Sequence, residues 1–158
     1  MAEDIRIKIR SVRFEVEASL FSDETDGEEI VDERGAEPET VEINTVGKLR
    51  DDGERIEVSY EETEVTGMEG STTSVTFAKG QDGIISMIRE GAVSTVLVFE
   101  EGKRHHCVYN TPFMPFQVCV HTLKVENRLL DEKYIALDYI VEIRGAKAER
   151  TRFRIDIL

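Results

Sequence analysis

The sequence has 158 residues and a net charge of −13, from 33 acidic and 20 basic side chains. This length is sufficient for one domain with its own hydrophobic core. The two cysteines are too few for a disulfide scaffold, the N-terminus lacks the apolar segment of a signal peptide, and no stretch of roughly 18 apolar residues is available to span a membrane. We therefore expect a cytoplasmic protein with a single domain over residues 1–158 and no membrane span.

The negative charge is concentrated in one part of the chain. The segment from Asp23 to Glu69 holds 18 acidic and 4 basic residues, whereas the rest of the chain holds 15 acidic and 16 basic residues. Binding to nucleic acid requires a dominant positive field, so the acidic segment is disfavoured as a nucleic-acid interface. The remainder of the chain is close to neutral and gives no strong nucleic-acid signal.

The N-terminal segment reads as a strand with a change of phase. Apolar residues stand at alternate positions at Ile5, Ile7 and Ile9, and the apolar residues between Val12 and Leu20 occupy the other phase. Successive side chains of a strand point to opposite faces, so this shift by one residue predicts a bulge or bend near Arg10 and Ser11.

An acidic segment follows, from Asp23 to Glu39, or about residues 22–39. It has no periodicity, little hydrophobicity and mostly one sign of charge. These properties predict a mobile loop. We consider two interpretations, a solvated insertion and a site that attracts a cation or a basic partner.

The central part of the chain, from Ile56 to Phe99, is a series of alternating apolar segments separated by glycine-containing turns, which predicts a β-meander. Further strands are predicted over residues 41–49, 105–111, 116–125, 135–143 and 151–157, and a short helical turn near Asn127 to Asp131. Eight to ten strands, with paired strands expected at both ends of the chain, favour an all-β closed antiparallel barrel over an open sheet. We expect Ile5 to Ile9 to pair with Phe153 to Ile157.

Several motifs of this region carry a resemblance to a known family. They are SerTyrGluGluThrGluValThrGlyMetGluGlySerThrThr (residues 59–73), the residues Arg89, Gly91 and Ser94, ValPheGluGluGly (98–102) and TyrAsnThrProPhe (109–113). With these motifs the chain from Val41 to Leu158 resembles the bacterial YwiB-like family of uncharacterised β-barrels. The chain departs from the family pattern in the PheMetPro that follows ThrPro, where a glycine is usual, and in a longer first loop. The resemblance implies a lipocalin-like (calycin) barrel with no assigned activity.

Eight side chains are candidates for ligand binding inside the barrel: Tyr60, Glu62, Glu64, Arg89, Phe99, Tyr109, Phe116 and Tyr139. Glu62 and Glu64 share the phase of the apolar residues before them, so they point inward unless the strand leaves the core by Glu61. A buried carboxylate must be paired or protonated. Arg89 is its natural partner if it points inward, and otherwise it is a solvent-exposed arginine at the end of a hairpin. The other inward aromatic residues are expected to be Phe14, Phe77 and Phe153. A barrel of about eight strands is either filled by its side chains or holds one small ligand, and the sequence leaves both open.

Six cations are predicted to share one exterior face if the first strand pairs with the last: Arg6, Lys8, Arg10, Arg150, Arg152 and Arg154. Like charges side by side reduce stability unless opposite charges offset them. This basic patch is either a docking surface for an anionic partner or a solvated face neutralised in part by Glu149 and Asp156.

The run His105-His106-Cys107 is the most suggestive group for a metal, because imidazole and thiolate are common ligands. The period of two places His106 on the same outer side as Cys119 and His121, with Cys107 facing inward. No fourth ligand has a fixed spacing to these three, so we expect surface histidines and no metal site. The opposite facing of Cys107 and Cys119 also excludes a disulfide between them.

The sequence contains no nucleophile elbow, phosphate-binding glycine loop or zinc-protease motif, which leads us to expect no enzyme and no cofactor. The leading hypothesis is a non-enzymatic barrel that binds a small lipophilic or anionic molecule in its lumen. The alternatives are a protein-interaction module, acting through the basic patch and the acidic loop, and an RNA-associated accessory protein.

Overall fold

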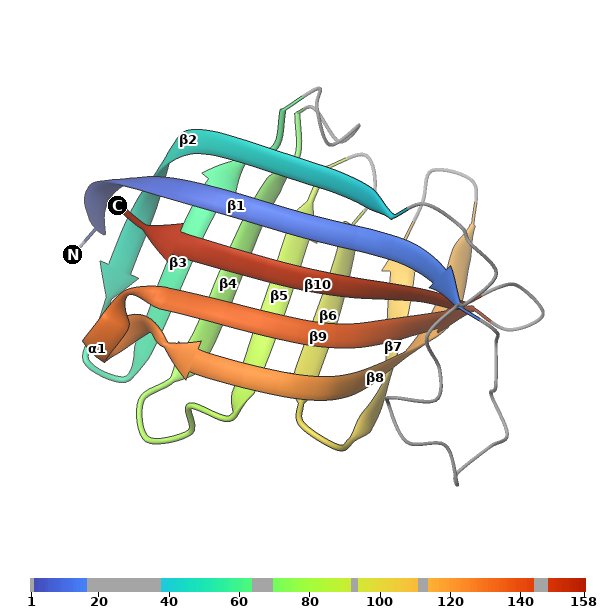
Figure 1. The fold of residues 1–158 in the computed structure, drawn as a ribbon. Helices are drawn as coiled ribbons and strands as arrows, with labels where there is room; N and C mark the ends of the chain where they lie inside the picture. Colours follow the sequence, from blue (N-terminus) through green and yellow to red (C-terminus); the bar gives the residue numbers. More distant parts are fainter. Residues whose placement is uncertain (1, 17–37, 64–69, 92–93, 111–113, 144–147) are drawn as a thin grey trace.

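The computed structural model describes residues 2–16, 38–63, 70–91, 94–110, 114–143 and 148–158, and it is nearly all strand (Figure 1). The elements are β1 (Ala2–Val16), β2 (Glu39–Asp51), β3 (Arg55–Glu61), β4 (Thr72–Ala78), β5 (Ile84–Glu90), β6 (Ser94–Glu100), β7 (Arg104–Asn110), β8 (Pro115–Arg128), α1 (Leu129–Glu132), β9 (Tyr134–Ile143) and β10 (Ala148–Ile157). The predicted acidic loop falls almost wholly outside the described residues, and β2 already begins at Glu39.

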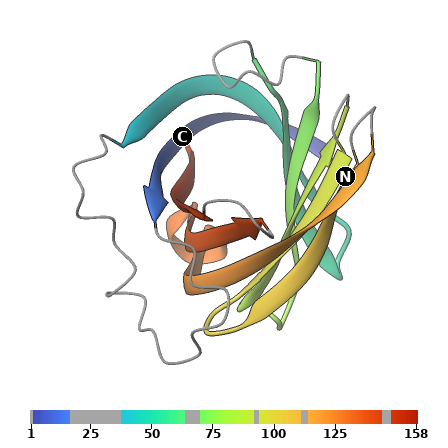
Figure 2. The ribbon, with the colours of Figure 1, turned by 90° about the vertical axis from the view of Figure 1, so that its right-hand side faces the viewer.

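Each strand pairs antiparallel with the next, and the first strand pairs with the last to close a ten-stranded barrel. Ile7 lies opposite Ile157 and Ile9 opposite Ile155, so the expected closure is confirmed. The short helix α1 lies between β8 and β9, at the end of the barrel where the chain begins. We call the other end, where β1, β3, β5, β7 and β9 finish and the even-numbered strands begin, the far end. Figure 2 views the barrel from the side on which β1 finishes and β2 begins.

The predicted bulge near Arg10 and Ser11 is wrong. The register of β1 runs without a shift against β10, from Ile7 to Val16, and against β2, from Ala2 to Arg13. The inward phase of Ile7 and Ile9 therefore continues through Ser11 and Arg13. Phe14, which was expected inside, lies on the outer surface, where it packs against a small cluster formed by Ile140 and Ala148.

Two local features bend the longer strands. β2 pairs with β1 along most of its length and begins to pair with β3 only at Gly47. A Cβ atom at Gly47 would lie 2.6 Å from the carbonyl oxygen of Ser59, so a glycine is required for this close approach. In β8 the register against β9 shifts between Thr122 and Lys124, which leaves Leu123 as the extra residue of a β-bulge.

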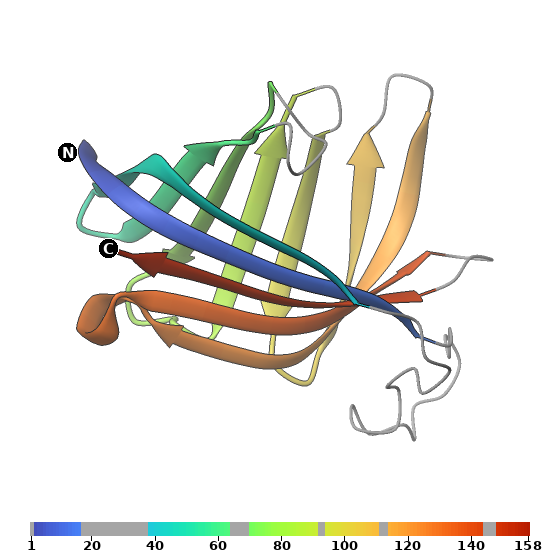
Figure 3. The ribbon, with the colours of Figure 1, turned by 45° about the horizontal axis from the view of Figure 1, so that its top comes forward.

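The seam between β6 and β7 is the weakest pairing in the described part of the barrel. Its register covers only Ser94 opposite Asn110 and Thr95 opposite Tyr109, and Figure 3 shows β7 standing apart from β6. The turn that joins the two strands has Gly102 at a φ of 78°, two residues after Glu100, whose carbonyl accepts a hydrogen bond from the Lys103 amide. This is the pattern of a type II turn, which splays the strands of a hairpin because its twist does not match theirs.

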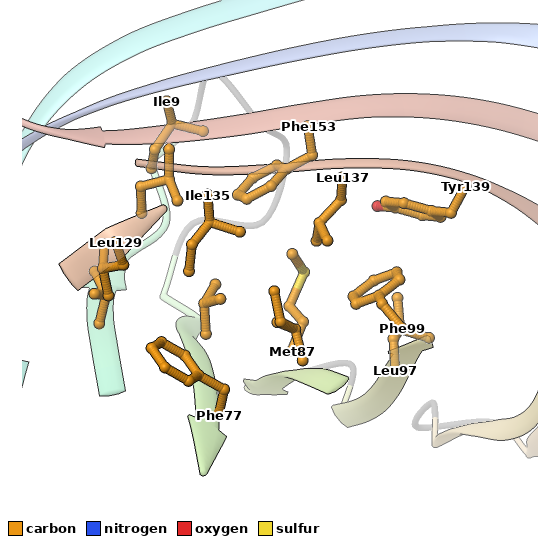
Figure 4. Close-up of a cluster of buried hydrophobic side chains, with 14 of the residues drawn as sticks. Ile9, Phe77, Met87, Leu97, Phe99, Leu129, Ile135, Leu137, Tyr139 and Phe153 are labelled. Carbon is orange, nitrogen blue, oxygen red and sulfur yellow. The ribbon is translucent and has the colours of Figure 1, made fainter. Parts of the chain in front are cut away.

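The core fills the half of the barrel nearest α1. Ile7, Phe77, Ile85, Phe99 and Ile135 are at most 1% exposed, and Figure 4 shows the side chains from β4, β5 and β6 meeting those from β9 and β10. Leu129 of α1 joins this cluster and covers the end of the barrel. No helix within the described residues has the length and apolar character needed to cross a membrane.

Replacing Phe99 by alanine should reduce the free energy of unfolding by about 3–5 kcal/mol, because the ring is fully buried and its removal leaves a cavity. Val96, in the same strand, is 47% exposed, so Val96→Ala is the matched control and should cost less than about 1 kcal/mol. Urea denaturation of both variants measures these values. Equal losses for the two variants would contradict the assignment of the inner and outer faces of β6.

Candidate functional site

A cavity of about 110 Å³ lies inside the barrel at the far end. Apolar side chains, including Met87, Leu97 and Phe153, line it on the side of the core. Its remaining lining is polar, with hydroxyl and charged groups contributed by Ser11, Arg13, Tyr60, Glu62, Arg89, Tyr109, Tyr139, Glu149 and Thr151. The barrel interior thus changes from wholly apolar near α1 to largely polar at the far end.

The most buried charge of this cavity is Glu62, whose side chain is 2% exposed. It follows β3 directly, two residues after Tyr60, and so keeps the inward phase of that strand. Thr73 of β4 lies opposite Tyr60 on one side and opposite Arg89 of β5 on the other. The register therefore gathers these four side chains on one wall of the barrel.

Hydrogen bonds join three of these side chains. The Thr73 hydroxyl donates to Glu62 Oε1 at 2.7 Å, and Arg89 Nε donates to the Thr73 oxygen at 3.2 Å. Arg89 Nη2 is 3.7 Å from Glu62 Oε1, an ion-pair distance that is too long for a hydrogen bond. Glu62 Oε2 is buried and has no hydrogen-bond partner in the described structure. A buried carboxylate oxygen without a donor is energetically unfavourable, so a donor that enters the cavity would stabilise this atom.

A second pair of charges contributes to the cavity from strands β1 and β10. Arg13 Nη1 is 3.9 Å from Glu149 Oε1, and these side chains are 32% and 47% exposed. The distance in this ion pair is longer than the distances around Glu62, and its side chains are more exposed to solvent. Ser11 and Thr151, each two residues away along its strand, also line the cavity.

Three tyrosines of the lining have pKa values above the ordinary range. Burial, followed by the charge of Glu62, raises the pKa of Tyr60. Burial raises the pKa of Tyr109 and raises that of Tyr139 to about 12. The positive charges of Arg89 and Arg13 act in the opposite direction and lower the pKa of both Tyr109 and Tyr139. All three hydroxyls are therefore neutral hydrogen-bonding groups at physiological pH.

The structure brings five of the eight sequence-predicted lumen residues to the cavity: Tyr60, Glu62, Arg89, Tyr109 and Tyr139. Phe99 faces inward but belongs to the fully buried core, where its ring packs against Tyr139 with 4.5 Å between the ring centroids. Glu64 lies outside the described residues. The backbone of Phe116 pairs with Tyr109, and its side chain is also outside the described part.

Sequence reasoning missed Ser11, Arg13, Glu149 and Thr151 as cavity residues. The expected bulge near Arg10 placed Ser11 and Arg13 on the outer face, and Glu149 was assigned to the exterior of β10. In β1 the apolar residues change phase at Val12, but the strand does not. The continuous pairing of β1 with both of its neighbours was the only signal that places Arg13 inside, and it is visible only in the structure.

The six cations of the basic patch lie on the outer faces of β1 and β10, as their strand phase predicts. Most of them contact acidic partners. Lys8 is 3.2 Å and Arg10 3.8 Å from Glu42 of β2, and Arg154 is 2.9 Å from Asp156. The counter-charges thus come mainly from neighbouring strands, and Glu149, expected here, lines the cavity instead.

Arg150 differs from the other cations of the basic patch because it is only 7% exposed. Its Nε and Nη2 atoms donate to the two carboxylate oxygens of Asp138 at 2.9 and 2.7 Å. The Phe14 ring lies 5.8 Å from its guanidinium carbon, within the range of a cation–π contact. Arg150 is therefore a buried structural cation of the outer surface and is not free to bind a partner.

The histidine and cysteine residues of β7 and β8 have the facing that the sequence predicts. His106 lies opposite Cys119, and Cys119 opposite Glu142 of β9. Burial lowers the pKa of His121 and raises that of Cys119. No group of three His, Cys, Asp or Glu side chains among the described residues is arranged to hold a metal ion. Both cysteines are free thiols.

The closed antiparallel barrel of ten strands defines the class of this protein as an all-β barrel with a lipocalin-like fold. Over residues 27–155 the sequence matches the family described as "Domain of unknown function (DUF1934)", and the chain belongs to that family. No curated protein matches the sequence.

The fold is also similar to a solved structure, "Crystal structure of ywiB protein from Bacillus subtilis". The TM-score is 0.65 at 16% sequence identity, and the match covers 99% of this chain and 93% of that chain. This likeness agrees with the family resemblance of the sequence and supports the lipocalin-like architecture.

Replacing Arg150 by glutamine should lower the free energy of unfolding by about 2–3 kcal/mol, because it leaves the half-buried Asp138 carboxylate without its two-point partner. Arg152→Gln is the matched control, since Arg152 is 58% exposed and lies 3.7 Å from the same carboxylate. The control should cost less than about 1 kcal/mol. Chemical denaturation distinguishes the two variants, and a loss for Arg150→Gln no larger than that for Arg152→Gln would show that Arg150 is not a structural cation.

Proposed function

We propose that this protein binds a small polar molecule in the cavity at the far end of the barrel. The observation that carries the proposal is Glu62 Oε2, a buried carboxylate oxygen on the cavity wall without a hydrogen-bond donor. A ligand that brings a donor satisfies this oxygen. The neighbouring Arg89 and the neutral tyrosine hydroxyls supply further directional contacts, which is the combination expected of a specific small-molecule site.

The volume of the cavity limits the size of the ligand. About 110 Å³ is well below the roughly 300 Å³ at which drug-sized ligand pockets begin. The size and the polar lining support a compact polar molecule and give less support to the lipophilic ligand that the sequence also suggested.

A non-enzymatic role and a cytoplasmic location are parts of the same proposal. The sequence carries no recognised catalytic motif, and both cysteines are free thiols, as is usual in a reducing compartment. The two alternatives, a protein-interaction module and an RNA-associated accessory protein, both depend on the basic patch. Its cations largely contact acidic side chains of the same barrel, which makes these alternatives the weaker proposals.

Native mass spectrometry of protein isolated under mild conditions tests the proposal together with a variant that fills the cavity. Ser11→Phe adds a ring to the cavity lining, and Val12→Phe adds the same ring at the next, outward-facing position of β1. The wild type and Val12→Phe should carry an additional small mass that Ser11→Phe lacks. Identical spectra for all three proteins, at equal folded fractions, would count against binding in the cavity.

A further inference from the structure

We infer that the ligand of this cavity is a small amino acid, with its ammonium group at Glu62 and its carboxylate at Arg13. This inference rests on the proposed function and specifies the chemistry of the ligand. It follows from the balance of charge in the cavity, the donor that Glu62 lacks, the different burial of the two charge pairs and the available volume.

The charges that line the cavity balance one another. Arg13 and Arg89 are positive, and Glu62 and Glu149 are negative. A ligand with one net charge would bring an uncompensated charge into a partly desolvated space, which is unfavourable. A ligand with no net charge avoids this cost, and a zwitterion also gains charged contacts at both of its ends.

The ammonium end is assigned by the unpaired oxygen. Glu62 Oε1 already accepts the Thr73 hydroxyl, whereas Oε2 has no donor among the described residues. An ammonium group brings three N–H donors, and a charged donor forms a stronger hydrogen bond to a carboxylate than a neutral one. Glu149 is a poorer site for this group because it is 47% exposed and therefore well solvated.

The carboxylate end is assigned by the loosely paired arginine. Arg13 is 3.9 Å from Glu149, close to the limit for an ion pair, and its side chain is 32% exposed. Its guanidinium is therefore available for the two parallel hydrogen bonds that arginine makes with a carboxylate. Arg89 is less available, because its Nε atom is engaged with Thr73 and the side chain is 15% exposed beside Glu62.

Volume and lining set the size of the amino acid. A cavity of about 110 Å³ accepts a backbone with at most a very short side chain. The apolar surface of Met87, Leu97 and Phe153 is suited to the methylene groups between the two charged ends. We therefore expect glycine, alanine or β-alanine to fit and amino acids with large side chains to be excluded.

Isothermal titration calorimetry of the full chain with five probes tests the inference. Glycine and β-alanine carry both charged ends, ethylamine and propionate carry one each, and trimethylglycine has both charges but no N–H donor. At least one of the two amino acids should bind at least tenfold more tightly than each of the other three probes. Binding of trimethylglycine as tight as that of the amino acids, or no binding of either amino acid, would overturn the inference.

Two variants with matched controls test which residue binds the ammonium group of the ligand and which binds its carboxylate. Glu62→Gln keeps the size of the side chain but removes its charge, and Glu61→Gln makes the same change at the preceding, exposed residue. Arg13→Gln is paired in the same way with Arg10→Gln, an exposed position on the outer face of β1. Glu62→Gln and Arg13→Gln should each weaken amino-acid binding at least tenfold, and the two controls should bind like the wild type. Thermal unfolding confirms that each variant is folded, and unchanged binding in folded Glu62→Gln would overturn the assignment.

The outcome also separates this inference from the proposed function. If neither amino acid binds but the native mass spectrum shows a small ligand that Ser11→Phe lacks, the amino-acid inference fails and the proposed function stands. If Ser11→Phe has no effect on the bound mass and the probes do not bind, both fail.

Discussion

The strict alternation of side chains around a closed barrel is the constraint on which the rest of this structure depends. Closure pairs β1 with both β10 and β2, and neither pairing contains a shift. Since the side-chain period of a strand is two, every residue of β1 then has a fixed face. The interior of the barrel therefore holds the isoleucines of the first half of β1 as well as the polar Ser11 and Arg13 near its end. One half of the lumen is apolar as a result, and the other half is polar.

The division of the lumen into an apolar and a polar half places the buried charges at one end of the barrel. Near α1 the lumen is filled by close-packed apolar side chains, as expected for a small barrel. At the far end the same inward phase carries Glu62, Arg89 and Arg13. Buried charges persist only when they are paired and hydrogen-bonded, and the Glu62–Thr73–Arg89 contacts satisfy this rule except at one carboxylate oxygen. This oxygen, Glu62 Oε2, is the centre of the proposed site.

Much of the fold is predictable from sequence because alternation, glycine turns and strand-like ends are local patterns. The same reasoning placed Tyr60 inside the barrel, but it left the facing of Glu62 and Arg89 open, because alternation alone does not show where a strand leaves the core. It failed between Arg10 and Phe14, where the apolar residues change phase and the strand does not. Phe14 covers Arg150 on the outer surface, while polar residues of β1 enter the cavity. Where a site requires polar residues inside the barrel, hydrophobicity does not predict which side chains point inward. The pairing of strands that are distant in sequence determines their orientation there.

The proposed site depends on Glu62 and Arg89 acting as one buried unit in the wall of the cavity. A double-mutant cycle on unfolding free energy, with Glu62→Gln, Arg89→Gln and the double variant, measures their coupling most directly. The side chains are 2% and 15% exposed and share Thr73, so we predict a coupling of about 1–2 kcal/mol. A coupling below about 0.3 kcal/mol would mean that the two charges are independent and would contradict a shared buried unit in the cavity wall.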